Sequence, residues 1–180
     1  MERLRKQKNV IRTRRLVQST NVPTELEYRC SMTNFQINVR VDRAILSHRL
    51  ALGPTVFPIH IRIGSNSFPD ANWDDFGLVI LAWWLEVAVP FVNGFTKSAV
   101  LRFMDGPFEL RMASHGNGEC SLAGIIRHDP EVEAFRDIAL TKDVLEAIVR
   151  ASIEALAAHQ SAGCRSQDYD ALKALVDGRQ

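Results

Sequence analysis

A chain of 180 residues with 46% hydrophobic residues is long enough for one globular domain with its own core, and this composition excludes a low-complexity or fibrous protein. Residues 1–20 hold seven of the 22 basic residues and one of the 21 acidic residues, a local charge of +6. The other residues therefore hold 15 basic and 20 acidic residues, a charge of −5. We expect a basic, mobile arm over residues 1–30 and a single mildly acidic domain over residues 31–180.

The cysteines and the longest apolar run indicate where the protein resides. Cys30, Cys120 and Cys164 are odd in number and far apart, which argues against a disulfide framework and fits a reducing compartment. No apolar stretch follows the charged start, so no secretory signal is expected. The apolar run over residues 76–92 contains Glu86 and is shorter than the roughly 20 apolar residues that span a bilayer. We therefore predict a cytoplasmic protein without a membrane anchor.

Two early segments alternate apolar and polar residues, and this period of two predicts half-buried strands. The first covers residues 35–42 and the second covers residues 57–63. Pro58 has no N–H for a strand ladder, so the second strand is expected to start near an edge or at its first residues.

A helix is predicted next, over residues 74–89, with Pro90 closing it. It is apolar on nearly all sides, whereas a helix with one solvent-exposed face would be polar on that face. Trp83 and Trp84 point about 100° apart, so two sides need cover. One side can lie on a sheet, and the other needs the C-terminal helices or a second subunit. A homodimer through this helix is therefore one hypothesis.

A β-hairpin is predicted from strands over residues 97–104 and 107–113, which flank an Asp-Gly pair. A two-residue loop would place apolar residues opposite apolar residues and Arg102 opposite Glu109. Pro107 cannot donate the hydrogen bond that closes such a loop, so we expect a looser turn.

The rest of the chain predicts two more strands and two helices. A strand is expected over residues 119–127, and residues 132–140 fit either a strand or a helix, with a strand favoured. The helices are expected over residues 142–160 and 166–176. The first has an apolar stripe of Leu145, Ile148, Val149, Ile153 and Leu156. The fold class is therefore α+β: an antiparallel sheet of four to six strands, one helix inserted after the second strand, and two C-terminal helices packed on one face.

The polar residues of the strands suggest a binding surface. If the apolar residues face the helices, the opposite face carries one arginine from each of four strands. Guanidinium groups form bidentate contacts with carboxylates, so this face is a candidate docking surface for an acidic partner. The alternative is a plain solvated face, which is the norm for antiparallel sheets. The candidate binding residues are Arg40, His60, Arg62, Arg102, Glu109 and Arg111, with Asn38 on the same face.

An acidic cluster is the second candidate. Asp70, Asp74 and Asp75, with His60, contain the groups that a small acid–base or metal-dependent hydrolase needs. All three aspartates lie at the start of the predicted helix, where carboxylates accept hydrogen bonds from free N–H groups. Helix capping is therefore the favoured interpretation.

Other functional sites receive less support. His115, Cys120 and His128 match no common zinc spacing, and no glycine-rich phosphate loop is present, so we expect no metal and no cofactor. The basic arm can attract nucleic acid through its phosphates but lacks interleaved aromatic residues. Dedicated nucleic-acid binding is not expected.

Two motifs carry a resemblance to a known group. The Trp-x-Asp-Phe sequence at residues 73–76, the helical Trp83 and the Phe-x-Asp-Gly-Pro-Phe sequence at residues 103–108 resemble a group of small, poorly characterised bacterial proteins. Over residues 55–178 the chain also resembles immunity-type proteins of bacterial toxin systems in size and organisation, although the basic arm departs from that pattern. The resemblance implies a binding role without established catalytic residues. We predict a non-enzymatic protein-binding function, with masking of a bacterial toxin as its specific form.

Overall fold

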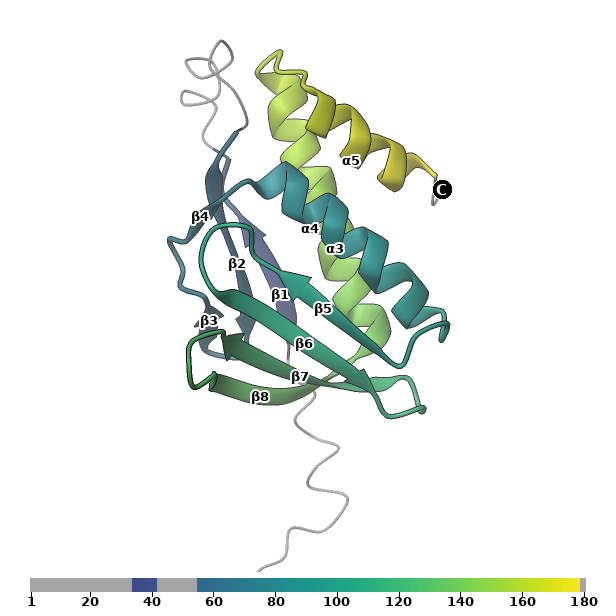
Figure 1. The fold of residues 1–180 in the computed structure, drawn as a ribbon. Coiled ribbons are helices and arrows are strands. Elements are labelled where there is room, and N and C mark those ends of the chain that lie inside the picture. Colours follow the sequence, from purple (N-terminus) through teal and green to yellow (C-terminus); the bar gives the residue numbers. More distant parts are fainter. Residues whose placement is uncertain (1–33, 42–54, 179–180) are drawn as a thin grey trace, which may run out of the picture. The chain divides into compact units, whose positions relative to one another are not determined.

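The computed structural model describes residues 34–41 and 55–178 (Figure 1). Antiparallel strands and three helices make up this part of the chain, which confirms the α+β class. The predicted arm over residues 1–30 lies outside the described residues, as do Cys30 and Asp42. The boundary between arm and domain stays a prediction.

The predicted single sheet is in fact two antiparallel sheets of four strands each. In the first, β2 pairs with β1 on one side and with β3 and β4 on the other. Ile37 lies opposite Ile61 and Asn38 opposite His60, so apolar residues share one face and polar residues the other. The strands of this sheet are β1 (Phe35–Val39), β2 (Phe57–Ile63), β3 (Asn66–Phe68) and β4 (Asp74–Asp75).

The second sheet has the order β5-β6-β7-β8. Its strands are β5 (Ser98–Arg102), β6 (Phe108–Ser114), β7 (Glu119–Ile126) and β8 (Val132–Leu140). The strand favoured over residues 132–140 is thus confirmed, and so is the hairpin register, because Arg102 lies opposite Glu109. Phe103 N–H donates to Phe108 O at 3.1 Å, and four residues turn between them. This looser turn is what the missing N–H of Pro107 predicts.

The central helix differs from its prediction at both ends. Helix α3 (Gly77–Val92) begins three residues later than predicted, since Asp74 and Asp75 form β4 instead of a helix start. Pro90 lies inside the helix instead of closing it. In the last turn its missing N–H removes a single helical bond. Its carbonyl oxygen accepts from Phe95 N at 2.8 Å as the chain leaves the helix.

The helices cover the apolar faces of the sheets. Helix α3 lies against β5, α4 (Thr141–Ser161) and α5 (Gln167–Asp177), and α4 also lies against β1 (Figure 1). Trp84 is fully buried, and its Nε1 donates to Arg102 O at 2.7 Å. The second side of α3 is thus covered by the C-terminal helices of the same chain.

The predicted stripe of α4 is partly wrong. Ile148 and Leu156 are buried as predicted, but Ile153 is 50% exposed. Small residues face the core instead, which allows α4 to approach α3 closely. The buried residues are Val144, Ala147, Ile148, Ala151, Ser152, Ala155, Leu156 and His159.

Candidate functional site

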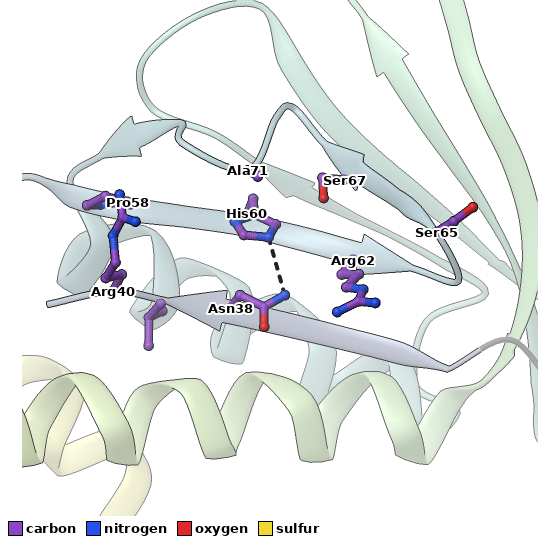
Figure 2. A pocket seen from close by; sticks show the side chains of 9 residues that line it. Asn38, Arg40, Pro58, His60, Arg62, Ser65, Ser67 and Ala71 are labelled. Carbon is purple, nitrogen blue, oxygen red and sulfur yellow. Dashed lines mark hydrogen bonds between the residues drawn. The ribbon is translucent and has the colours of Figure 1, made fainter.

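An open hollow of about 440 Å³ lies on the outer face of the first sheet (Figure 2). We call it the polar hollow. Its described lining residues carry hydroxyl, amide, imidazole and guanidinium groups, with a few small or apolar residues and no carboxylate among them. The lining residues are Asn38, Val39, Arg40, Pro58, His60, Arg62, Ser65, Ser67 and Ala71.

Strand alternation explains why these side chains share one face. The odd-numbered residues of β1 and β2 are apolar and point into the core, so the even-numbered residues point outward. Asn38 lies directly opposite His60, and Asn38 Nδ2 is 3.3 Å from His60 Nε2. The structure therefore brings together the four predicted residues Asn38, Arg40, His60 and Arg62, as Figure 2 shows.

The surroundings of His60 lower the pKa of its imidazole. Burial lowers the pKa of His60, the charge of Asp70 opposes this effect, and the charges of Arg62 and Arg40 add to it. The amide of Asn38 can donate to Nε2 only when that nitrogen is unprotonated. The ring is therefore neutral near pH 7 and gains a positive charge in mildly acidic solution.

The two arginines of the hollow have no counter-ion in the described part of the chain. Arg40 reaches only Asn72 Oδ1, at 3.5 Å, and Arg62 donates from Nε to Gly64 O at 3.3 Å. Both side chains are exposed. The hollow therefore presents two positive charges that its own residues do not neutralise, and it is chemically suited to an anionic ligand.

The remaining predicted residues lie on the second sheet, not beside the hollow. Glu109 is 3% exposed because arginine side chains cover it. Arg111 Nε is 2.6 Å from Glu109 Oε1, and Arg102 Nε and Arg127 Nε lie 3.5 and 3.6 Å from Glu109 Oε2. Arg111 also forms a bidentate pair with Glu131 at 2.6 and 3.0 Å. We call Arg102, Arg111, Arg127 and Glu109 the arginine cluster; each of its three guanidinium groups lies within 3.6 Å of a carboxylate oxygen.

The acidic cluster does not form a site. Asp74 is exposed, and Asp70 Oδ1 accepts from Asn72 N at 2.8 Å in a local turn. Asp75 is buried at the end of the first sheet. Within residues 34–41 and 55–178, no three acidic, histidine or cysteine side chains group in a way suited to a metal ion.

Asp75 joins the two sheets, and helix capping is the wrong interpretation for it. Its carboxylate accepts from Met104 N at 3.0 Å and from Asp105 N at 3.2 and 3.3 Å, in the turn between β5 and β6. It also accepts from Phe76 N at 2.7 Å and from Trp73 Nε1 at 3.4 Å. Burial raises the pKa of Asp75, and these N–H donors oppose the rise. A carboxylate committed to four donors is structural, not a free acid or base.

Two further candidates are settled by burial. Burial raises the pKa of Cys120 to about 11, so its thiol is a core group and not a reactive thiolate. Trp83 is 42% exposed and Trp84 fully buried. Of the two tryptophans, only Trp83 is exposed enough to contribute to a homodimer through α3, which stays a prediction.

In comparisons with known proteins, no protein-family model, no curated protein and no solved structure matches the chain. Among the described helices, none combines the length and the apolar character needed to cross a bilayer.

Several site residues had no signal in the sequence. Ser65 and Ser67 of the hollow belong to a tight turn and a three-residue strand, which are too short for a visible period. Arg127 and Glu131 lie beyond the ends of β7 and before β8, where alternation no longer indicates a face. Arg127 and Glu131 would have been included only by a search for charged residues just past the ends of predicted strands.

Proposed function

We propose that this protein is a non-enzymatic binding protein that recognises an acidic surface of a partner protein through the polar hollow. The observation that carries the proposal is the pair Arg40 and Arg62: two exposed guanidinium groups in a concave surface whose described lining residues include no carboxylate. Charge complementarity of this kind accelerates association and selects acidic partners.

The chemistry of the hollow supports binding more than catalysis. Burial lowers the pKa of His60, and its Nε2 lies 3.3 Å from Asn38 Nδ2. The described lining residues include no carboxylate to orient the imidazole and no cysteine to act as a nucleophile. In the described part of the chain no hydrogen bond joins Ser65 or Ser67 to the imidazole, so a nucleophile–base pair is not supported.

The specific form of the proposal is an immunity-type role, in which the protein masks a bacterial toxin inside the cell. Its support is the resemblance of residues 73–76 and 103–108. Trp73 and Asp75 from the first motif contact the turn in the second, so the motifs support the fold. The hollow would supply the specificity for the partner.

Capture of partners with two charge-matched variants tests the proposal. R40Q/R62Q removes two arginines from the hollow, and R102Q/R127Q removes two from the arginine cluster, so both lose the same charge. We expect wild type and R102Q/R127Q to capture the same acidic protein from a lysate of the source organism, and R40Q/R62Q to lose it.

The captured protein is then purified and its binding measured directly. We expect salt-dependent binding that R40Q/R62Q weakens at least tenfold, and growth protection on co-expression if the partner is a toxin. Equal binding by wild type and R40Q/R62Q, both folded, contradicts the proposal.

A further inference from the structure

A second hollow, of about 320 Å³, adjoins the polar hollow. We call it the aromatic hollow. It lies between β3, which ends the strand order of the first sheet, and the start of β6, the end of β7 and the edge strand β8 of the second sheet. Its lining residues are Ser65, Asn66, Ser67, Phe68, Pro69, Phe108, Ile126, Ala134 and Phe135.

Three aromatic rings form the apolar part of this hollow. Phe68 packs edge-on against Phe108 and Phe135, with ring centroids 5.8 and 5.3 Å away. Phe108 and Phe135 are only half-buried, as is Ile126. Phe68 is buried and supports the rings of Phe108 and Phe135, which stay partly exposed and suit contact with an apolar side chain of a ligand.

Strand β3 lies between the two hollows, and Ser65 and Ser67 line both. Ser67 points outward and lines the polar hollow, as Figure 2 shows, whereas Phe68 points inward to the aromatic rings. In the described part of the chain, β3 pairs with β2 on one side and has no strand on the other. An edge of this kind presents backbone N–H and C=O groups to an added strand.

We propose that the free edge of β3 binds an extended segment of the partner in which acidic and apolar residues alternate. This inference rests on the proposed function and specifies the ligand of the same site. In an added strand, successive side chains point to opposite faces. Those on the Ser67 side enter the polar hollow, and those on the Phe68 side enter the aromatic hollow.

The register places a guanidinium within reach of the acidic residue. Arg62 lies directly opposite Ser67, so a residue added beside Ser67 continues the same row. The small serine leaves room for the long Arg62 side chain to cross it. In Figure 2 this guanidinium lies on the β1 side, and its exposure allows it to turn toward the added strand.

Two synthetic peptides of equal composition test the proposal with the full-length protein. One alternates, acetyl-Glu-Phe-Glu-Phe-Glu-amide, and the other is blocked, acetyl-Glu-Glu-Glu-Phe-Phe-amide. Any attraction to the basic residues 1–20 is the same for both, because their charge is the same. We expect the alternating peptide to bind at least tenfold more tightly and to slow amide hydrogen exchange at Ser67, the residue of β3 whose N–H points away from β2.

Variants of the aromatic hollow locate the binding. Ala134 is exposed, so A134W fills the hollow without disturbing the core, and A171W on the exposed side of α5 is its matched control. We expect A134W to remove the preference for the alternating peptide and A171W to keep it. F135L retains an apolar side chain and should therefore retain most of the preference for the alternating peptide.

The outcomes separate this inference from the proposed function. Equal affinity for both peptides, lost in R40Q/R62Q, overturns the alternating strand and leaves the acid-binding hollow intact. Affinity that does not change in R40Q/R62Q overturns both. An amide of Ser67 that is strongly protected before peptide is added, and unchanged by it, overturns the inference because the edge is then covered by the chain itself.

Discussion

Each sheet carries a pair of exposed arginines: Arg40 and Arg62 on the first, and Arg102 and Arg127 on the second. Different groups face the two pairs. In the second sheet, Glu109 supplies a buried carboxylate within 3.6 Å of both arginines. In the first sheet, the arginines reach only an amide oxygen and a backbone carbonyl.

This difference separates two uses of one residue type. An arginine neutralised within the fold covers a buried acid and contributes to stability, whereas an arginine without a counter-ion keeps its charge for a ligand. We therefore expect changes at the arginine cluster to alter the free energy of unfolding. Changes at the polar hollow should alter binding.

The largest expected effect comes from separating the two sheets at Asp75. D75A removes the carboxylate that accepts from four N–H groups and leaves these donors unpaired in a buried site. We expect a loss of about 3–4 kcal/mol in the free energy of unfolding, measured by urea denaturation. D74A changes the exposed neighbour and should cost less than about 0.5 kcal/mol. Similar losses in both variants would show that Asp75 does not join the sheets.

The next largest effect tests the role of Glu109. E109A leaves three arginines without their shared carboxylate, and we expect a loss of about 2 kcal/mol in the free energy of unfolding. The exposed Arg136–Glu133 pair on β8 provides the control, because E133A should cost no more than about 0.5 kcal/mol. R40Q/R62Q should also leave stability within about 0.5 kcal/mol of wild type. A loss there equal to that of E109A would remove the contrast between the two faces.

A smaller effect concerns the pH dependence of ligand binding. Burial lowers the pKa of His60, so the imidazole becomes charged only as the pH falls below its ordinary range near 6.5. That charge adds a third cation to the hollow. We expect the affinity for an acidic peptide to rise roughly three- to fivefold between pH 7.5 and 5.5, which corresponds to an exposed charge pair. H60Q should flatten this profile, and a wild-type affinity that falls with pH would contradict the account.

The last effect concerns stability at low pH. His159 is 2% exposed, its Nδ1 lies 2.8 Å from Ala155 O, and its Nε2 has no hydrogen-bond partner within the described residues. Burial lowers the pKa of His159, so the unfolded chain binds the proton more readily than the folded one. Stability should therefore be full above pH 6.5 and decline below it, by at most about 1.4 kcal/mol per pH unit. Urea denaturation of wild type and H159Q across pH 5–7.5 checks this, since H159Q should decline less steeply.

The strand faces could be predicted from the sequence because alternation is a local property of the chain. Residues 35–39 and 57–63 show the period of two, and their polar members do line one surface. Alternation does not say which strands share a sheet. The division of the arginines between two sheets was therefore not predictable from it.

Asp75 and Glu109 show why the contacts of the buried carboxylates could not be predicted from the sequence. Asp75 accepts from residues 29 and 30 positions away, and no local pattern distinguishes this contact from a helix cap. Glu109 occupies the polar face, as its position predicts, but Arg127 covers it from beyond the end of a strand. Both carboxylates are buried by long-range partners.

The most direct test of the central claim is an NMR titration of the full-length protein with acetyl-Glu-Glu-Glu-amide, which follows the Nε–Hε signals of individual arginines. The account predicts that the signals of Arg40 and Arg62 shift together and saturate with one dissociation constant, while those of Arg102 and Arg127 in the same sample stay in place. Shifts confined to Arg102 and Arg127, or equal shifts at all four arginines, would contradict it.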